Sequence, residues 1–233
     1  MSRTDSAKSP LLRTLFPSYW RVDSLIRDEV VELSDEVLDW TSDRWGWSLW
    51  SIRQQTSHMV SVPLRWLIGM WGDQIFGDEW PVSQEHYDSL NSKEFDRRLD
   101  DRVFWEIEDI LGALDEVIGI SRQVLVDTTI ARARSIRVER RVHEQWKLMR
   151  TVHPDGVSEN RETGEMSVMD RVVTFRHIQN EFYTHLINVQ RAKIALGIEP
   201  IVKLPDTGYH TASGWDSEVP ILGAALSDFE QTQ

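Results

Sequence analysis

Hydrophobic residues recur at intervals of three and four positions along much of the chain, a spacing that predicts amphipathic helices. The first helix is expected over residues 20–33. The second is expected to begin at Ser51, which forms a capping-box pattern with Gln54, and to end near residue 72. These helices each have one apolar stripe, so each is expected to pack on a shared core.

Two further long helices are expected in the second half of the chain. The third is predicted over residues 93–125, where apolar positions keep the helical spacing. The last is predicted to start near Ser167, which forms a cap signal with Asp170, and to end at Gly197. Long helices of this kind, joined by connections of varied length, imply an all-α fold, specifically a four-helix bundle.

The chain divides into a bundle and two flanking segments. The bundle is expected over residues 18–197, between a flexible N-terminal lead-in at 1–17 and an irregular C-terminal tail at 198–233. Within the bundle, residues 130–150 fit both a helix stripe and the alternation of a strand, and periodicity does not decide between them. Residues 153–164 are expected to form a loop, since they contain a Pro-Asp-Gly turn.

Composition and charge restrict the possible functions. The 233 residues have a net charge of −12, whereas binding to a phosphate backbone or an anionic membrane surface needs clustered positive charge. We therefore expect neither nucleic-acid nor membrane binding. The chain has no cysteine, which excludes disulfides, thiolate ligands to a metal and a cysteine nucleophile. The eleven tryptophans are expected to pack between long helices, with a few of them lining a pocket.

The expected location is the cytoplasm. Residues 1–10 are polar and lack the apolar core of a secretory signal. The most apolar run, residues 60–71, is too short for a membrane span and contains Pro63 and Arg65. If Arg65 faces a pocket, it could take an anionic group of a substrate; otherwise it is a solvent-exposed side chain.

Candidate metal ligands line one face of the last predicted helix. At about 100° per residue, His177 and His185 lie about 40° to either side of Glu181. Apolar residues border this polar stripe on both flanks, which a purely solvent-facing surface does not require. Two residues of this set, with one from another helix and a water, could hold Zn, Ni, Fe or Mn. The same spacing is also common on exposed helix faces, so a solvated face is the alternative.

Three segments resemble the DinB/YfiT-like family of helical metalloproteins. Residues 33–40 (LSDEVLDW) and 50–58 (WSIRQQTSH) are similar to the family's first-helix end and second-helix start, and the second segment ends in the first metal ligand. Residues 175–185 (FRHIQNEFYTH) are similar to its last helix, which carries two more ligands. The resemblance covers roughly residues 15–197 and implies a four-helix bundle with one divalent metal.

The resemblance implies a metal site at His58, Glu181 and His185. His58 matches the first ligand and His185 the third, while Glu181 stands where the family usually has histidine. A carboxylate can coordinate the same metals, and a set of two histidines and one glutamate is familiar from catalytic zinc sites. Two alternatives stay open. His177 could serve as an outer-shell partner or a substitute ligand, or the site could have lost its metal.

The resemblance also implies a class of chemistry. Family members are often dimeric, and some are S-transferases or isomerases that use bacillithiol, mycothiol or glutathione. We therefore expect a homodimeric metal-dependent enzyme that binds a small-molecule substrate and activates a low-molecular-weight thiol. The alternatives are a hydrolase that uses metal-bound water and a non-catalytic, stress-associated metal-binding bundle.

Overall fold

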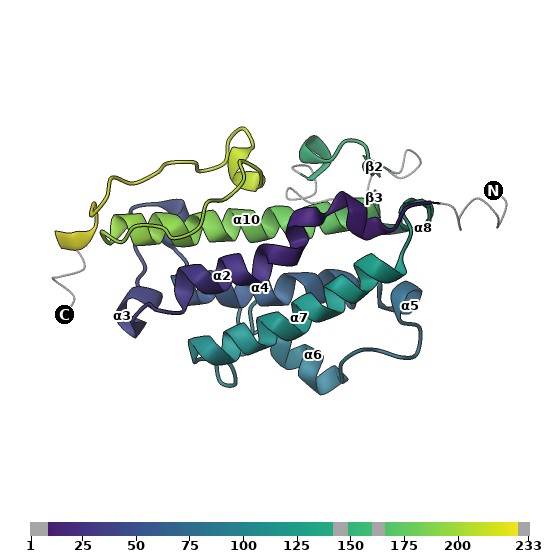
Figure 1. The fold of residues 1–233 in the computed structure, drawn as a ribbon, viewed down its shortest axis with the longest axis horizontal. Helices are drawn as coiled ribbons and strands as arrows, with labels where there is room; N and C mark the ends of the chain where they lie inside the picture. The colour runs from purple at the N-terminus through teal and green to yellow at the C-terminus, as the bar shows by residue number, and fades with distance from the viewer. Residues whose placement is uncertain (1–8, 142–148, 160–165, 228–233) are drawn as a thin grey trace.

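The computed structural model describes residues 9–141, 149–159 and 166–227, and in this part the chain is mostly helical. The longest helices run side by side along the long axis of the molecule (Figure 1). Helix α10 packs on α4 and α2, and α7 packs on the same two helices. These long helices are α2 (Val22–Val30), α4 (Ile52–Leu67), α7 (Ile107–Asp127) and α10 (Arg171–Ala195).

Short helical segments lie before α2, in the connections between the long helices and in the tail. The polar connection after α4 contains two of them, α5 and α6. The short α-helices are α3 (Asp35–Leu38), α5 (Gly72–Ile75), α6 (Gln84–Leu90) and α8 (Ile130–Ser135), and the short 3-10 helices are η1 (Leu12–Leu15), η2 (Pro17–Arg21), η3 (Gly46–Ser48) and η4 (Tyr209–Thr211).

Helix α4 starts where the capping pattern predicts. The Ser51 hydroxyl accepts a hydrogen bond from the Gln54 amide (3.2 Å), and the Gln54 side chain accepts one from the Ser51 amide (3.1 Å). Two backbone donors that a helix start leaves without partners are thereby satisfied. The helix ends at Leu67, about one turn earlier than predicted.

The third long helix begins much later than its apolar spacing predicts. Helix α7 starts at Ile107, and residues 93–106 form a loop instead. In this loop Asp96 and Arg97 have positive φ angles (48° and 65°), which a right-handed helix does not allow. Leu99 is fully buried, as its spacing predicts, but it reaches the core from a loop. Its backbone amide donates a hydrogen bond to the Ser57 hydroxyl (3.0 Å).

A small antiparallel sheet stands beside the helices, and the all-α prediction did not include it. Strand β3 (Met166–Asp170) lies between β1 (Arg137–Arg141) and β2 (Val157–Glu159). In β1 the strand alternation noted for residues 130–150 is therefore the correct alternative. The positions Val142, Trp146 and Leu148, which carried the same ambiguity, lie outside the described residues.

Helix α10 starts at Arg171, so the prediction of a start near Ser167 was wrong. Ser167 belongs to β3, and Asp170 is the residue that caps the helix, accepting a hydrogen bond from the Val173 amide (2.9 Å). Although α10 has 25 residues, it is interrupted by charged and polar side chains. Within the described ranges, none of the helices has both the length and the apolar character needed to cross a membrane.

Both flanking segments contribute to the core. In the expected flexible lead-in, Leu12 and Phe16 are buried, and the Leu12 amide donates to the Thr128 carbonyl (2.7 Å). The tail after Gly197 runs as an irregular strap along α10 (Figure 1). It is joined to that helix near the middle, where the Tyr209 amide donates to the Thr184 hydroxyl (2.8 Å).

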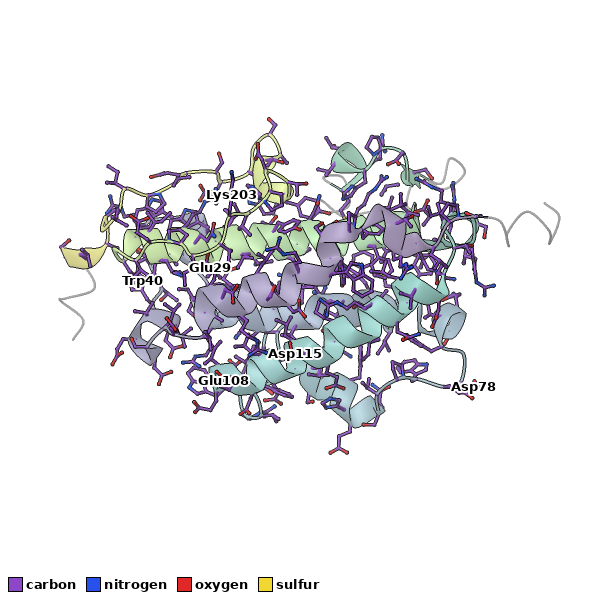
Figure 2. All side chains as sticks on the ribbon, viewed as in Figure 1. Glu29, Trp40, Asp78, Glu108, Asp115 and Lys203 are labelled. Atoms are coloured by element: carbon purple, nitrogen blue, oxygen red, sulfur yellow. The ribbon has the colours of Figure 1, made fainter. Side chains whose placement is uncertain are left out.

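A buried ion pair fastens the strap to the helices. Glu29 of α2, labelled in Figure 2, and Lys193 of α10 are both almost completely buried and form a direct salt bridge. The second carboxylate oxygen of Glu29 accepts hydrogen bonds from the amides of Ile201 (3.0 Å) and Val202 (2.8 Å) and from the side chain of Gln190 (2.7 Å). A charge out of water needs such partners, because burial without them costs several kcal/mol.

Candidate metal centre

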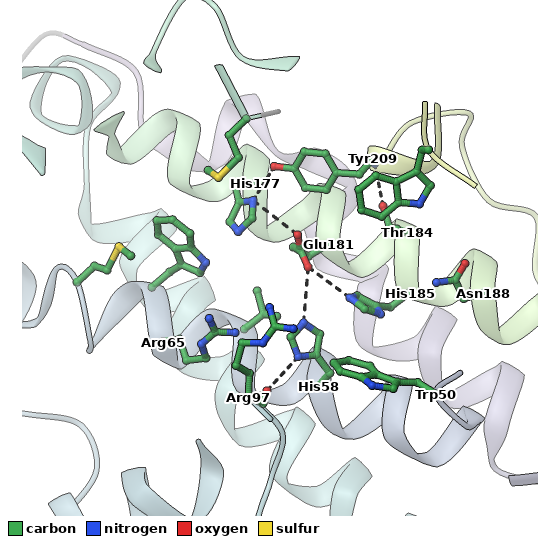
Figure 3. Close-up of a pocket in the computed structure, with 15 residues that line it drawn as sticks. Trp50, His58, Arg65, Arg97, His177, Glu181, Thr184, His185, Asn188 and Tyr209 are labelled. Atoms are coloured by element: carbon green, nitrogen blue, oxygen red, sulfur yellow. Dashed lines mark hydrogen bonds and ion pairs between the residues drawn. The ribbon is translucent and has the colours of Figure 1, made fainter. Parts of the chain in front are cut away.

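His58 from α4 and Glu181 and His185 from α10 come together in the space between the two helices (Figure 3). The Oε2 atom of Glu181 lies 3.6 Å from Nε2 of His58 and 3.3 Å from Nε2 of His185. His58 is buried, and the other two side chains are partly buried. The structure therefore brings together all three ligands that the sequence predicts, from segments more than 120 positions apart.

A backbone carbonyl determines which nitrogen of His58 carries the proton. Nδ1 of His58 lies 2.9 Å from the carbonyl oxygen of Arg97, and a carbonyl only accepts, so Nδ1–H is the donor. The hydroxyl of Ser61 donates to the same carbonyl, which holds the loop against α4. Burial, together with His185, lowers the pKa of His58 to about 4. Near neutral pH, His58 is therefore uncharged and presents the lone pair of Nε2 to Glu181.

Gln55 orients His185 in the way that the Arg97 carbonyl orients His58, with Nδ1 bonded to an oxygen and Nε2 facing Glu181. The Gln55 amide nitrogen donates to the carbonyls of Trp47 (3.2 Å) and Trp50 (3.5 Å), which identifies the other end of the side chain as the oxygen. That oxygen lies against Nδ1 of His185, so Nδ1–H is again the donor. Nε2 of His185 is left facing Glu181 (3.3 Å). Metal-bound histidines commonly have their second nitrogen bonded to a carbonyl or amide oxygen in this way.

Glu181 completes a set of three electron-pair donors. Burial acts to raise the pKa of its carboxyl, but the neighbouring histidines His185, His58 and His177 together outweigh burial and hold the pKa well below its usual range. Glu181 is therefore a carboxylate at neutral pH. Ligand atoms about 2.1 Å from a tetrahedral zinc ion stand ~3.4 Å from each other. The observed separations of 3.3 and 3.6 Å fit that arrangement.

His177 lies beside the three ligands but outside their group. Its Nδ1 is 3.8 Å from Oε1 of Glu181 and 2.6 Å from the hydroxyl of Tyr209. That hydroxyl is also 3.2 Å from Nε2 of His153. Burial lowers the pKa of each histidine to about 4 and raises the pKa of Tyr209, so all three are neutral at pH 7. This geometry favours His177 as a neighbour of the site over its alternative role as a substitute ligand.

A cavity of about 270 Å³ opens beside the three ligands. Trp50 forms part of its wall, stacked 6.0 Å from His185 and edge-on to His58 at 5.1 Å between ring centroids. Glu181 is the one carboxylate among the described lining residues. The lining consists of Trp50, His58, Val62, Arg65, Trp66, Met70, Arg97, Met149, His177, Glu181, Thr184, His185, Asn188, Tyr209 and Trp215.

Sequence reasoning missed several residues that shape the site. Gln55 lies three positions before His58, on the same side of α4, so helical spacing could have identified it. Arg97 contacts His58 through its backbone carbonyl. Every residue type has this group, so the residue type at position 97 could not have indicated the contact. Tyr209 lies in the tail, which has no periodicity to indicate its place. Arg65, by contrast, faces the cavity, as one of the two sequence alternatives proposed.

Comparison of the chain with models of protein families, with curated proteins and with solved structures finds no match in any of the three. The similarity of its motifs to DinB/YfiT-like proteins therefore stays a prediction. What the site can do has to be argued from its geometry and chemistry.

Proposed function

We propose that this chain is a divalent-metal-dependent enzyme with a DinB/YfiT-like four-helix bundle. His58, Glu181 and His185 hold the metal, and a small-molecule substrate enters the adjoining cavity. One observation carries the proposal: two imidazoles on different helices, each with Nδ1 held by an oxygen acceptor, direct their Nε2 atoms at the same carboxylate oxygen. Three electron-pair donors in this arrangement attract a cation, and imidazole with carboxylate suits Zn, Ni, Fe or Mn.

The number of ligands supports a catalytic site over a purely structural one. Structural zinc sites normally use four protein ligands, whereas catalytic sites use three and leave a position open. When bound, the metal lowers the pKa of a thiol or water in that open position. Gln55 and the Arg97 carbonyl keep both histidines oriented, and Trp50 and Trp66 form part of the cavity wall.

Transfer of a low-molecular-weight thiol to an electrophile is the reaction we propose first. The chain has no cysteine, so the sulfur nucleophile has to come from a co-substrate. The cavity has a volume suited to a small molecule and is lined by aromatic and sulfur-containing side chains as well as polar ones.

A second candidate reaction is hydrolysis by metal-activated water. The hydrogen-bonded series His177, Tyr209 and His153 favours it, because such a series beside Glu181 can pass a proton between the site and His153.

Metal content tests the centre directly. We expect about one divalent ion per chain in the purified wild type after exposure to Zn²⁺ and removal of excess metal, measured by elemental analysis. His58→Ala should lose most of this metal. His86→Ala is the matched control, since His86 is a half-buried histidine of α6 that pairs with Glu116 and does not line the cavity. Equal metal in the wild type and His58→Ala, or none in either, would contradict the proposal.

Activity then distinguishes the two reactions. The metal-loaded protein is incubated with glutathione, mycothiol or bacillithiol and the electrophile 1-chloro-2,4-dinitrobenzene, and separately with activated esters and no thiol. Turnover that needs both a thiol and His58 supports the transferase, whereas ester cleavage without thiol supports the hydrolase. If the metal-loaded protein has neither activity, the enzymatic part of the proposal fails for these substrates and the metal centre stands alone.

A further inference from the structure

Arg65 places a positive charge in the wall of the cavity. It lies on α4 seven positions after His58, which is about two helical turns, so both side chains share one face of the helix. In the described part of the chain, no hydrogen bond or ion pair is made by its guanidinium group. Buried or partly buried guanidinium groups are normally bonded to acceptors, because removing them from water is costly.

Arg97 brings a second guanidinium group to the same cavity (Figure 3). Its backbone is in the left-handed region (φ 65°), and its carbonyl oxygen accepts the Nδ1–H of His58. The hydrogen bond that orients His58 therefore also fixes the backbone position from which the Arg97 side chain extends. Burial, and next the charge of Arg97, lowers the pKa of Arg65, while the charges of Glu181 and Asp96 act in the opposite direction.

The protein balances only part of the positive charge at the cavity: Arg97 forms an ion pair with Asp96 (3.2 Å), whereas Arg65 has no such partner among the described residues. Glu181 is the single carboxylate among the described lining residues, and it already faces the two histidine ligands. Arg65 therefore adds to this cavity a positive charge that no hydrogen-bonded acceptor among the described residues offsets, in a chain whose net charge is −12. With a divalent cation held by Glu181, the excess of positive charge becomes larger. Such a local excess attracts anionic molecules from solution.

We propose that Arg65, assisted by Arg97, forms an anion-binding subsite that takes an anionic oxygen group of the substrate while another part of the substrate lies at the metal. This inference rests on the proposed metal centre and narrows its substrate class to small anionic molecules. Arginine suits this role because its planar group binds a carboxylate through two parallel hydrogen bonds.

Two small thiols that differ in charge test the subsite. The probe is 3-mercaptopropionate, and its uncharged counterpart is 3-mercapto-1-propanol. Each is titrated into the Co²⁺-loaded protein, and binding of the thiolate is followed by its charge-transfer absorption. We expect the wild type to bind the carboxylate-bearing thiol about tenfold or more tightly than the alcohol, as for a hydrogen-bonded charge pair.

The variant Arg65→Gln should lose this preference while its Co²⁺ content stays at the wild-type level. Arg65→Lys keeps the charge without the planar group and should retain part of the preference. Arg102→Gln is the matched control: it removes the same charge from the loop that carries Arg97, but Arg102 is exposed and pairs with Asp100 (2.7 Å). Circular dichroism of each variant checks that it folds.

The outcomes separate this inference from the metal centre. If Co²⁺ binds and Arg65→Gln keeps the wild-type preference for the carboxylate, the subsite is overturned and the metal centre stands. If the wild type does not bind Co²⁺, the proposed function fails instead. The subsite is then judged by calorimetric titration of the same two probes into the metal-free protein. There, a carboxylate preference that Arg65→Gln abolishes supports the subsite, and equal binding of the two probes overturns it.

Discussion

Substitution of Gln55 by methionine tests how the site orients its ligands. Gln55 is buried, and its amide oxygen accepts the Nδ1–H of His185 while its nitrogen holds two backbone carbonyls. Methionine has nearly the same length and shape but offers no comparable acceptor. In Gln55→Met the imidazole of His185 can rotate, or carry its proton on Nε2, the atom that faces Glu181. Both changes remove a lone pair from the metal position.

The expected magnitude follows from this single hydrogen bond. Loss of a partner behind a metal-bound histidine typically weakens metal binding by about 10- to 100-fold. We expect Gln55→Met to fall in this range, because His58 keeps its own partner, the Arg97 carbonyl (2.9 Å), and Glu181 is unchanged. The variant also leaves the Trp47 and Trp50 carbonyls without their side-chain donor, so its free energy of unfolding should be lower by about 1–3 kcal/mol.

Competition for Zn²⁺ with a chromophoric chelator measures the affinity, and urea unfolding of the metal-free proteins measures stability. Gln190→Met is the matched control. Its amide donates two side-chain hydrogen bonds, to Glu29 (2.7 Å) and to the Val202 carbonyl (2.8 Å), at a place remote from the ligands. It should lose stability and keep wild-type affinity for Zn²⁺. Wild-type affinity in Gln55→Met as well would refute the argument that Gln55 selects the tautomer of His185.

Three further predictions concern the surroundings of the site. Glu29→Gln leaves the buried ammonium of Lys193 without its carboxylate, so the free energy of unfolding in urea should fall by about 3 kcal/mol or more. The double variant Glu29→Met/Lys193→Met should recover most of this stability. An equal loss in the single and the double variant would contradict the ion-pair argument. The pKa of His153 is lowered to about 4, mainly by burial, so the unfolded chain binds more protons than the folded chain between about pH 6.5 and 4, and stability falls as the pH falls through this window. Between pH 7 and 5 the free energy of unfolding of the metal-free wild type should drop by about 2 kcal/mol more than that of His153→Gln, and parallel pH profiles would exclude a buried neutral histidine. Tyr209→Phe removes the hydroxyl bonded to His177 and should reduce stability by about 1–3 kcal/mol with unchanged Zn²⁺ content, whereas loss of the metal would assign that hydroxyl to the site itself.

Features that depend on neighbouring positions along the chain were predictable. The start of α4 followed from Ser51 and Gln54, since a capping box forms within one helical turn. The stripe of His177, Glu181 and His185 followed from the pitch of a helix, which places residues four apart on one face. The end of α10 before Gly197, whose φ is +78°, followed from the conformational freedom of glycine at that position.

Features that depend on distant pairing were not predictable from periodicity. The apolar spacing at residues 93–106 indicated a helix, but hydrogen bonds with Ser57, His58 and Ser61 hold that segment as a loop on α4. Strand β3 lies between β2, which is the strand directly before it in the chain, and the more distant β1, so part of its pairing is not local. Tertiary contacts of this kind override local propensity, because they satisfy backbone groups that the helix would otherwise satisfy.

The candidate site itself shows the same division. The sequence alone determined which side chains with metal-binding chemistry share a face of α10, because helix geometry is local. Only the tertiary structure decided that His58 meets them, that Gln55 and the Arg97 carbonyl select their tautomers, and that Arg65 faces the same cavity. The physical reason is that helical pitch relates residues within a few turns, whereas the approach of α4, α10 and the loop before α7 results from packing of the whole core.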